Sequence, residues 1–453
     1  MKKLYVECTQ TWESKNHCGI SRVVRNILLE GMEDEEYQVI PMIIRYGAGY
    51  GISYSELNVK KEEGFVRSSK LYDYLTEVYL SFLAVIAAVF PFGAVLRFIY
   101  KPKGEFGLLY LINVLFLLPV RTVRAYLKKE GGFGRAANSK VVEGFVGEKL
   151  RFYADDIVLL PDCPWAAGNV SFYKSLLASG VKIYMYCHDI IPISHPNYFF
   201  KNGASNSYKP WFDEMVDSFS GIFCVSQYTA SRVDQYMKIL NSSRCLQKKV
   251  IDVPVFVSKL GVAFEQDDDD EPGNVVKELV SKSSGEFYLM VGTIEVRKNH
   301  ITVLNAFEVL WDLGYTMPLY IAGSWGWSVD NLYERVLASK YKDIYLFIIN
   351  DASDADIKHL YRGARSLVFS SHSEGFGLPL VESAYYHLPV IASDTEINRE
   401  VAGSSAQYFD VDDSFSLIKV ILDVENGEVK QKVSNIKTIS WNDSWLKIKH
   451  YLI

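Results

Sequence analysis

Two glutamates, Glu374 and Glu382, stand at the two ends of a glycine-containing loop. The loop reads Ser373-Glu374-Gly375-Phe376-Gly377-Leu378-Pro379-Leu380-Val381-Glu382. It follows an apolar run that predicts a buried strand, and its proline predicts that a helix begins here. The glycines let the backbone approach a ligand, and N–H groups at a helix start suit phosphate. Carboxylates on either side can hold hydroxyl groups, and a diphosphate between two polyols is a nucleotide sugar. The alternative is an ordinary strand–loop–helix connection with two solvated glutamates.

A pair of adjacent cations, Arg297 and Lys298, follows a second apolar run that ends in Gly292-Thr293. Cations beyond the carboxyl end of a strand suit a pyrophosphate, because arginine offers a planar fork and lysine a point charge. A helix is predicted directly after them. The alternative, a solvated basic pair at a helix start, is disfavoured by the helix dipole.

His188 closes a further apolar run, 182–187, in the first half of the chain. Open α/β sheets bind ligands beyond the carboxyl ends of their strands, so His188 is a candidate ligand-binding residue. A structural histidine is the alternative. The neighbouring Asp189 could contact substrate or fix the loop, and Ser226 is predicted to cap the helix that follows it.

These motifs resemble glycosyltransferase family 4, whose retaining members carry the E-x7-E signature on two Rossmann-like domains. The resemblance extends through the following segments: Asp356-Ile357-Lys358-His359-Leu360-Tyr361-Arg362-Gly363-Ala364, the loop 373–382, Leu388-Pro389-Val390-Ile391-Ala392-Ser393, Glu400-Val401-Ala402-Gly403 and Ala406-Gln407-Tyr408-Phe409-Asp410. The sequence departs from the family at Ser370, where proline is usual, at His387, where glycine is usual, and at Thr293, where arginine is usual. The run 292–299 resembles bacterial mannosyltransferases of surface polysaccharide synthesis.

The resemblance implies transfer of a hexose from a nucleoside diphosphate to a hydroxyl of a glycan acceptor, with retention of configuration. It assigns Glu374 to the sugar or an oxocarbenium-like state, Glu382 to the ribose, and His188 to the donor sugar. Arg297 and Lys298 would stabilise the departing diphosphate. The other expected donor-binding residues are Gly375, Phe376, Gly377, Leu378, Gly19 and Thr293.

The expected donor is GDP-mannose, the expected acceptor is lipid-linked, and no cofactor or metal is expected. Asp354-Ala355-Asp356 has the D-x-D form of a metal site but precedes a predicted helix, where carboxylates commonly serve as caps. Two other functions remain open: a non-catalytic, transferase-like scaffold of a membrane polysaccharide complex, and a sugar-nucleotide epimerase of the same architecture.

The expected fold is α/β, with two Rossmann-like doubly wound domains (GT-B) and an apolar helical insertion. Apolar runs at about 3–9, 157–161, 182–187 and 221–225, each followed by a helical pattern, predict parallel sheets. The acidic segment 264–273 is a predicted linker. We therefore expect an N-terminal acceptor domain over 1–260, a donor-binding domain over 274–430, and a C-terminal helix within 431–453 that packs back on the first domain.

Residues 60–150 match nothing in the family pattern and contain two long uncharged runs, 78–96 and 106–120, flanked by lysines and arginines. The second run is shorter than a membrane span, and the first contains Pro91 and Gly93. We expect residues 75–129 to dock on a membrane surface as a helical hairpin. The alternatives are a buried packing or dimer surface and a transmembrane hairpin.

The composition is that of a folded protein with a large core: 453 residues, of which 49% are apolar. The net charge of −6 gives no reason to expect a nucleic-acid partner. The six cysteines show no metal-binding spacing and suit a reducing compartment. The apolar run after Met1 is too short for a signal peptide. The expected location is cytoplasmic, peripheral on the inner face of the cell membrane.

Overall fold

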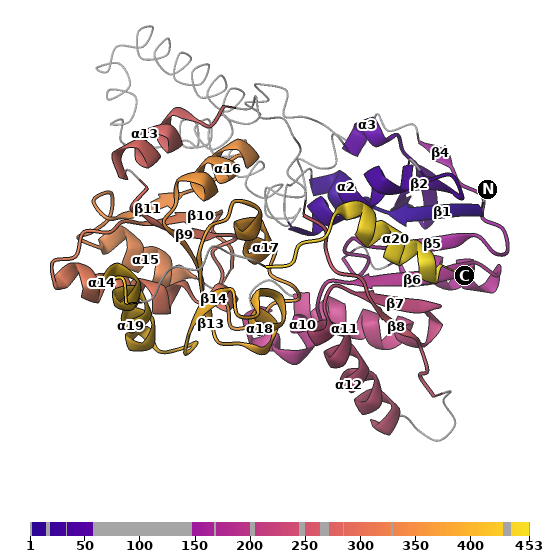
Figure 1. Ribbon diagram of the computed structural model, residues 1–453. Helices are drawn as coiled ribbons and strands as arrows, with labels where there is room; N and C mark the ends of the chain where they lie inside the picture. Colours follow the sequence, from indigo (N-terminus) through magenta and orange to yellow (C-terminus); the bar gives the residue numbers. More distant parts are fainter. Residues whose placement is uncertain are drawn as a thin grey trace, which may run out of the picture. The chain divides into compact units, whose positions relative to one another are not determined.

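The structure is a computed structural model that describes residues 2–14, 19–32, 34–57, 147–166, 169–199, 204–243, 250–262, 271–283, 285–327, 329–428 and 436–452. The chain divides into two compact units, one of residues 1–54 with 149–453 and one of residues 55–148. The first unit contains two β-sheets with their helices (Figure 1). The predicted insertion, with its membrane-docking segment 75–129, lies almost wholly outside the described residues.

The first sheet has eight strands in the order β4-β3-β2-β1-β5-β6-β7-β8. The strands are β1 (Lys2–Glu7), β2 (Tyr37–Arg45), β3 (Ala48–Gly51), β4 (Glu148–Lys149), β5 (Ile157–Leu160), β6 (Lys182–Cys187), β7 (Gly221–Cys224) and β8 (Val255–Val257). Strands β2, β1, β5, β6, β7 and β8 pair in parallel, as the alternation of apolar runs and helices predicts. Chain order reverses between β1 and β5, which makes this the switch point of the sheet.

One strand that was not predicted departs from this parallel pattern, because β3 runs antiparallel to β2. Tyr46 and Gly47 join the two strands and both have positive φ, 49° and 72°. Two such residues form the tight turn that matches the twist of a β-hairpin. The sequence does not predict β2 and β3, because Tyr46-Gly47, which joins them, is not a typical hairpin signal. The short strand β4 also lies within the range 60–150 that was assigned to a helical insertion.

The second sheet has six strands in the order β11-β10-β9-β12-β13-β14, and every pairing in it is parallel. The strands are β9 (Tyr288–Val291), β10 (Leu319–Ala322), β11 (Leu346–Ile349), β12 (Ser366–Phe369), β13 (Val390–Ser393) and β14 (Ala406–Phe409). This is a doubly wound order, in which the order of the strands along the chain reverses between β9 and β12. The loops that leave these two strands therefore meet at one edge of the sheet.

Helices connect the strands of each sheet (Figure 1). With the first sheet are α1 (Thr9–Ser14), α2 (Gly19–Met32), α3 (Tyr54–Leu57), α9 (Val170–Ala178), α10 (Ile191–Ser194), α11 (Ala204–Met215) and α12 (Gln227–Ser243). With the second are α13 (Asn274–Ser283), α14 (His300–Asp312), α15 (Asp330–Ala338), α16 (Asp354–Gly363), α17 (Leu378–Tyr385), α18 (Glu396–Ala402) and α19 (Ser414–Glu425). Three short 3₁₀ helices cover Pro196–Phe199, Val216–Ser218 and Val296–Lys298.

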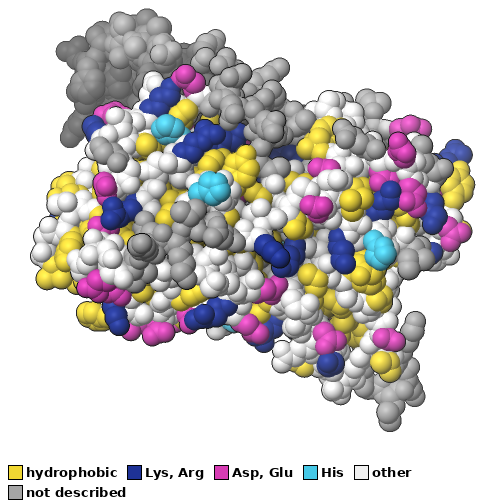
Figure 2. Space-filling model, in the orientation of Figure 1, with side chains coloured by type: hydrophobic (Ala, Val, Ile, Leu, Met, Phe, Trp, Pro, Cys, Tyr) yellow, Lys and Arg dark blue, Asp and Glu magenta, His cyan; other side chains and the backbone are white. Residues whose placement is uncertain are grey.

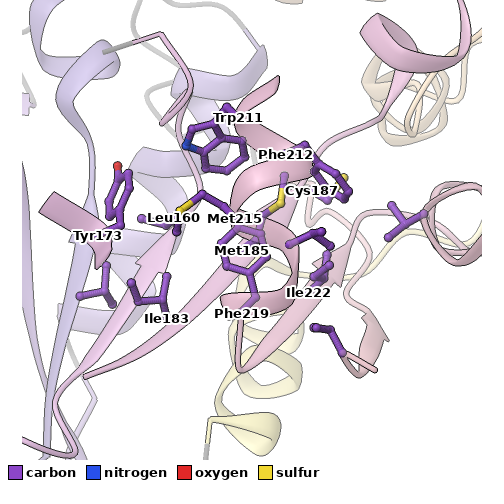
Figure 3. Packing of buried hydrophobic residues seen from close by; sticks show 14 of the residues in the cluster. Leu160, Tyr173, Ile183, Met185, Cys187, Trp211, Phe212, Met215, Phe219 and Ile222 are labelled. Carbon is purple, nitrogen blue, oxygen red and sulfur yellow. The ribbon is translucent and has the colours of Figure 1, made fainter. Parts of the chain in front are cut away.

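Each sheet buries its own apolar core. In the first, side chains of β5, β6 and β7 pack against aromatic and methionine side chains of α9 and α11 (Figure 3). Tyr173, Phe212 and Met215 are fully buried there. In the second, Leu304, Phe307 and Leu310 are buried on α14, the helix predicted directly after Arg297 and Lys298. These cores hold the strand ends, and thus the loops beyond them, in fixed positions.

The last helix, α20 (Trp441–Tyr451), packs against α2 of the first sheet (Figure 1). It begins with a capping box in which Ser440 accepts a hydrogen bond from the backbone N–H of Asp443. The indole of Trp445 donates to Asp34 at 3.0 Å, and Lys449 pairs with the same carboxylate at 3.0 Å. The chain thus returns to its first sheet after completing the second.

Within the described ranges, no helix is both long and apolar enough to cross a membrane. On the face shown in Figure 2, acidic and basic side chains of the described residues are interspersed.

Candidate active site

The loops after β9 and β12 bring Glu374 together with Arg297 and Lys298. The Lys298 amino group donates to one oxygen of Glu374 at 2.7 Å, and the Arg297 guanidinium contacts the other oxygen at 2.6 Å. Arg297 also donates to the carbonyl of Ser373 at 2.8 Å. The three side chains are largely buried. Two sequence motifs that were predicted separately therefore form one cluster at the switch point of the second sheet.

The two cations of this cluster favour the ionised form of Glu374. Burial alone would raise the pKa of Glu374, but the positive charges of Arg297 and Lys298 outweigh it and hold the pKa at about 2. The pKa of Arg297 is raised, since the neighbouring carboxylates outweigh the effect of burial. Glu295 pairs with Arg297 from the other side and is itself buried. The cluster holds two cations and two carboxyl groups in a site of low dielectric constant.

Gly375 has no room for a side chain. A Cβ there would lie 1.8 Å from the carbonyl oxygen of His188, so only glycine permits this approach. The carbonyl of Gly375 accepts hydrogen bonds from the hydroxyls of Ser226 at 2.6 Å and Thr229 at 3.1 Å. Ser226 also accepts from the backbone N–H of Thr229 at 3.0 Å, which confirms its predicted role as the cap of α12. The loop is thus bound to the first sheet.

The loop turns into α17 at Gly377, which has a φ of 95°. Pro379 occupies the first turn of this helix, as predicted, and the side chain of Phe376 is buried. Leu378 begins the helix and lies beside Gly19, where a Cβ on Gly19 would be 3.6 Å from Leu378 Cδ1. The first turns of α2 and α17 therefore lie next to each other, although they belong to different sheets.

His188 directly follows β6 and lies partly exposed against the loop of Gly375. Its Nε2 lies 2.6 Å from the carbonyl oxygen of Pro161. A carbonyl can only accept, so Nε2 carries the proton and Nδ1 of the neutral ring is an acceptor. Burial lowers the pKa of His188 to about 4, partly opposed by that hydrogen bond. The neutral ring can therefore accept a hydrogen bond from a hydroxyl group at neutral pH.

Asp189 fixes the loop in this structure. Its Oδ1 accepts a hydrogen bond from the backbone N–H of Ile191 at 2.9 Å, and its carbonyl accepts from Tyr208 at 2.9 Å. Burial raises the pKa of Asp189, and the charge of Arg297 opposes this effect. Of the two roles left open by the sequence, the structure shows the positioning one.

Glu382 lies one turn into α17 and is buried, away from the Glu374 cluster. The guanidinium of Arg22 donates to its Oε1, and the hydroxyl of Tyr361 donates to its Oε2 at 2.8 Å. Arg22 belongs to α2 and Tyr361 to α16. The carboxylate is therefore held from both sheets.

Thr293, another predicted site residue, does not join the cluster of Glu374, Arg297 and Lys298. Its side chain is exposed, and its methyl group lies 2.9 Å from where a Cβ on Gly326 would be. The arginine that is usual at this position in the family has no counterpart here. Arg297 and Lys298 are the cations that contact Glu374 among the described residues.

Two other departures from the family pattern have structural explanations. Ser370 donates a hydrogen bond to the carbonyl of Lys298 at 2.7 Å, which ties the β12 loop to the cation pair. Proline has no donor for such a bond. His387 has a φ of 54°, a conformation that glycine adopts without strain.

The D-x-D sequence forms the start of α16. Asp356 completes a capping box with Ser353, and its other oxygen accepts from the backbone N–H of Gly273 at 2.7 Å. Among the residues described, no group of three or more acidic, histidine or cysteine side chains is arranged to hold a metal ion.

Sequence reasoning missed several residues that shape the site. Glu400 was quoted only for its resemblance, yet its carboxylate accepts from the backbone N–H groups of Gln227 and Tyr228 at 2.8 and 2.7 Å. It thus caps α12 from the other sheet. Trp327 likewise donates to the carbonyl of Tyr198 at 2.7 Å. Arg22 and Glu295 lie close in sequence to the predicted site residues Gly19 and Arg297, but nothing in their spacing shows which carboxylate or cation each contacts.

Comparison with protein families identifies the second half of this architecture. Residues 271–437 match the family model of glycosyl transferases group 1, so the chain contains a glycosyltransferase group 1 domain. The cluster of Glu374, Arg297 and Lys298 lies within this range.

The relatives found by sequence include several bacterial mannosyltransferases. The chain is 28% identical to the serotype-specific mannosyltransferase WbdA of Escherichia coli, over 72% of this chain and 41% of that protein. It is 29% identical to the O-antigen chain mannosyltransferase RfbU of Salmonella typhimurium, over 42% of this chain and 54% of that protein. The chain thus spans about two fifths of the length of the WbdA proteins it matches. The predicted resemblance to bacterial mannosyltransferases is confirmed.

Solved structures share the fold at low sequence identity. HepE of Anabaena, solved in complex with UDP and glucose, superposes with a TM-score of 0.56 at 10% identity, over 100% of this chain and 99% of that one. The N-terminal domain of trehalose-6-phosphate phosphatase of Candida albicans gives a TM-score of 0.53 at 13% identity, over 99% and 96%. The predicted GT-B architecture, with two mainly parallel sheets, is confirmed.

Proposed function

We propose that this protein transfers a hexose from a nucleoside diphosphate sugar to a hydroxyl of a glycan acceptor, in bacterial surface polysaccharide synthesis. The observation that carries the proposal is the cluster of Glu374, Arg297 and Lys298 at the switch point of a group 1 domain. Ligands of doubly wound sheets bind at such points. Two buried cations beside a glycine loop and a helix start suit a diphosphate.

Charge balance suggests how the donor would bind. The carboxylate of Glu374 forms ion pairs with both Arg297 and Lys298 in this structure. An incoming diphosphate would replace that carboxylate as the partner of the two cations. Glu374 would then be free to face the sugar and stabilise positive charge at the anomeric carbon. The cations would stabilise the charge that develops on the departing diphosphate.

The reaction breaks the bond between the anomeric carbon and the diphosphate oxygen and forms one to the acceptor oxygen. The hydroxyl proton of the acceptor passes to the departing phosphate oxygen, and the configuration is retained, as the resemblance to family 4 implies. Neutral His188 would accept a hydrogen bond from a sugar hydroxyl. Glu382 would hold the ribose hydroxyls.

The proposed donor is GDP-mannose, because the relatives WbdA and RfbU are mannosyltransferases. The complex of HepE with UDP and glucose makes UDP-glucose the donor to compare. We propose that transfer needs no divalent ion, since in Asp356 of the D-x-D sequence one carboxylate oxygen completes the capping box and the other accepts from the N–H of Gly273. Activity in EDTA tests this point.

The decisive experiment incubates the protein with GDP-mannose, UDP-glucose and other nucleotide sugars, with a glycan acceptor, and measures nucleoside diphosphate release and product. We expect one donor to support transfer, and NMR of the product to show the anomeric configuration of the donor. Glu374→Ala is the inactive control. Donor binding without transfer or hydrolysis under any condition would favour the scaffold. Interconversion of two nucleotide sugars without an acceptor would favour the epimerase.

The acceptor is proposed to be lipid-linked, with the enzyme peripheral on the inner face of the cell membrane through residues 75–129. The uncharged runs in this segment, flanked by cations, support the proposal. Flotation with anionic vesicles tests it: the full chain should float, and a chain lacking 75–129 should not. If the full chain stays at the bottom, the segment is an internal or dimer surface instead.

A further inference from the structure

The buried carboxylate of Glu382 is held by one donor on each oxygen. Arg22 donates to Oε1 and Tyr361 donates to Oε2 at 2.8 Å. The side chain of Glu382 is 7% exposed and that of Arg22 is 29% exposed. Burial and the nearby carboxylate raise the pKa of Tyr361 well above its usual value, so its hydroxyl keeps the proton it donates.

This arrangement leaves acceptor capacity on both oxygens. An ionised carboxylate has about four lone-pair sites on its two oxygens, and the described residues use one site on each. Two sites therefore remain, one on each oxygen and at a fixed separation. A vicinal diol offers two O–H donors at a matching separation, whereas a single hydroxyl uses only one of these sites.

Arg22 also compensates the charge of Glu382. A buried carboxylate without a cation is costly, and the pKa of Arg22 is raised, chiefly by the charge of Glu382. A second contact of Arg22, to the exposed Asp354 at 3.5 Å, is longer. Arg22 reaches Glu382 because Gly19, one turn earlier on α2, lies directly against Leu378 at the start of α17.

We infer that Arg22, from the first sheet, is a positioning residue of the donor site that orients Glu382 to accept both hydroxyls of the donor's ribose. The inference rests on the proposed function, in which Glu382 holds the ribose. Ribose recognition would then depend on α2, which carries Arg22, as well as on the group 1 domain. Donor affinity is therefore linked to the contact between the two sheets at Gly19 and Leu378.

The test compares a nucleoside diphosphate with its 2′,3′-dideoxy analogue by calorimetry, using whichever of GDP, UDP and ADP binds the wild-type protein most tightly. Wild type should prefer the ribose form by at least about tenfold, the value of one hydrogen bond to a charged acceptor. Glu382→Gln should lose most of this preference. Arg22→Gln should lose it as well, to within about twofold, while its affinity for the dideoxy analogue stays near the wild-type value.

The matched control is Arg232→Gln. Arg232 pairs with Glu396 at 3.0 Å, and the two residues also belong to different sheets, but they lie on exposed surfaces. This variant should keep the full ribose preference. If Arg22→Gln does not fold, as judged by its melting temperature, Arg22→Lys keeps the charge but loses the planar fork. It should show a reduced preference.

The outcomes separate the inference from the proposed function. If Glu382→Gln loses the preference and folded Arg22 variants keep it, the inference is overturned and the ribose role of Glu382 stands. Equal loss of affinity for both ligands in Arg22→Gln would also overturn it, since Arg22 would then act on the diphosphate or on folding. If Glu382→Gln keeps the preference, or if none of the three nucleotides binds wild type, the proposed function fails first.

Discussion

The carbonyl oxygen of His188 occupies the space that a side chain on Gly375 would need. A Cβ on Gly375 would lie 1.8 Å from that oxygen and 2.9 Å from the carbonyl carbon. The end of β6 and the glutamate loop after β12 are therefore in backbone contact. This contact places the His188 side chain beside the loop that carries Glu374.

We expect Gly375→Ala to separate these two loops, because no real Cβ tolerates such a distance. Transfer should fall at least about a hundredfold, the cost typical of a misplacement near 1 Å. The melting temperature should fall by only a few degrees, since the two cores are untouched. Gly273→Ala is the control, because a Cβ there would meet its nearest atom at 3.4 Å. Normal activity in Gly375→Ala would show that the contact is not required.

Glu374→Ala should separate catalysis from binding. The substitution removes the carboxylate that now occupies Arg297 and Lys298, so both cations become available to a diphosphate. We expect transfer to fall at least about a hundredfold, the loss seen when one electrostatic contact to a transition state is removed. Calorimetry should show nucleoside diphosphate affinity that is unchanged or higher. Retention of most activity with the natural acceptor would contradict the role of Glu374.

Removing both cations should have the opposite effect on binding. In the Arg297→Ala, Lys298→Ala double variant, two charge-assisted contacts are lost, each worth about 1.5–3 kcal/mol. The Kd for a nucleoside diphosphate should rise by at least about a hundredfold. The control is the double variant Lys340→Ala, Arg399→Ala, which removes two exposed cations paired with Asp312 and Asp394. Unchanged calorimetric binding would place the diphosphate site elsewhere.

Two buried acids at the switch point of the first sheet predict a pH dependence of stability. Burial and the nearby Asp162 raise the pKa of Glu7 above its usual 4.5, and Oε2 of Glu7 has no hydrogen-bond partner among the described residues. Burial also raises the pKa of Asp162, whose Oδ2 accepts from the N–H of Thr11 at 2.7 Å. The folded state therefore binds more protons than the unfolded state between the ordinary and the raised pKa values.

Stability should consequently fall as the pH rises from 4.5 through the raised pKa of Glu7. Glu7→Gln removes this titration and keeps an oxygen for its bond from the Thr9 N–H. We expect its melting temperature to be less pH-dependent and higher than that of wild type at alkaline pH. Glu214→Gln, at an exposed ion pair, should follow wild type. Parallel curves for Glu7→Gln and wild type would mean that Glu7 is ionised in the folded protein.

Much of the fold follows from local patterns in the sequence. The apolar runs at 157–161, 182–187 and 221–225 are strands, and Pro379 and Ser226 mark helix starts as predicted. Such features depend on residues within a few positions of one another, so their causes are visible in a linear sequence. The hairpin of β2 and β3 was missed because its turn uses Tyr46 in a conformation that side chains seldom adopt.

Residue types and spacing indicated which residues could do chemistry, and they predicted that Arg297, Lys298 and Glu374 follow strands of one sheet. Which of these groups meet depends on how the chain packs in three dimensions. The strand order puts β9 beside β12 and so joins those two motifs. Arg22 contacts Glu382 across 360 positions of chain, and His188 meets Gly375 from another sheet. Contacts of this kind arise from the packing of two separate cores, which no spacing within either motif records.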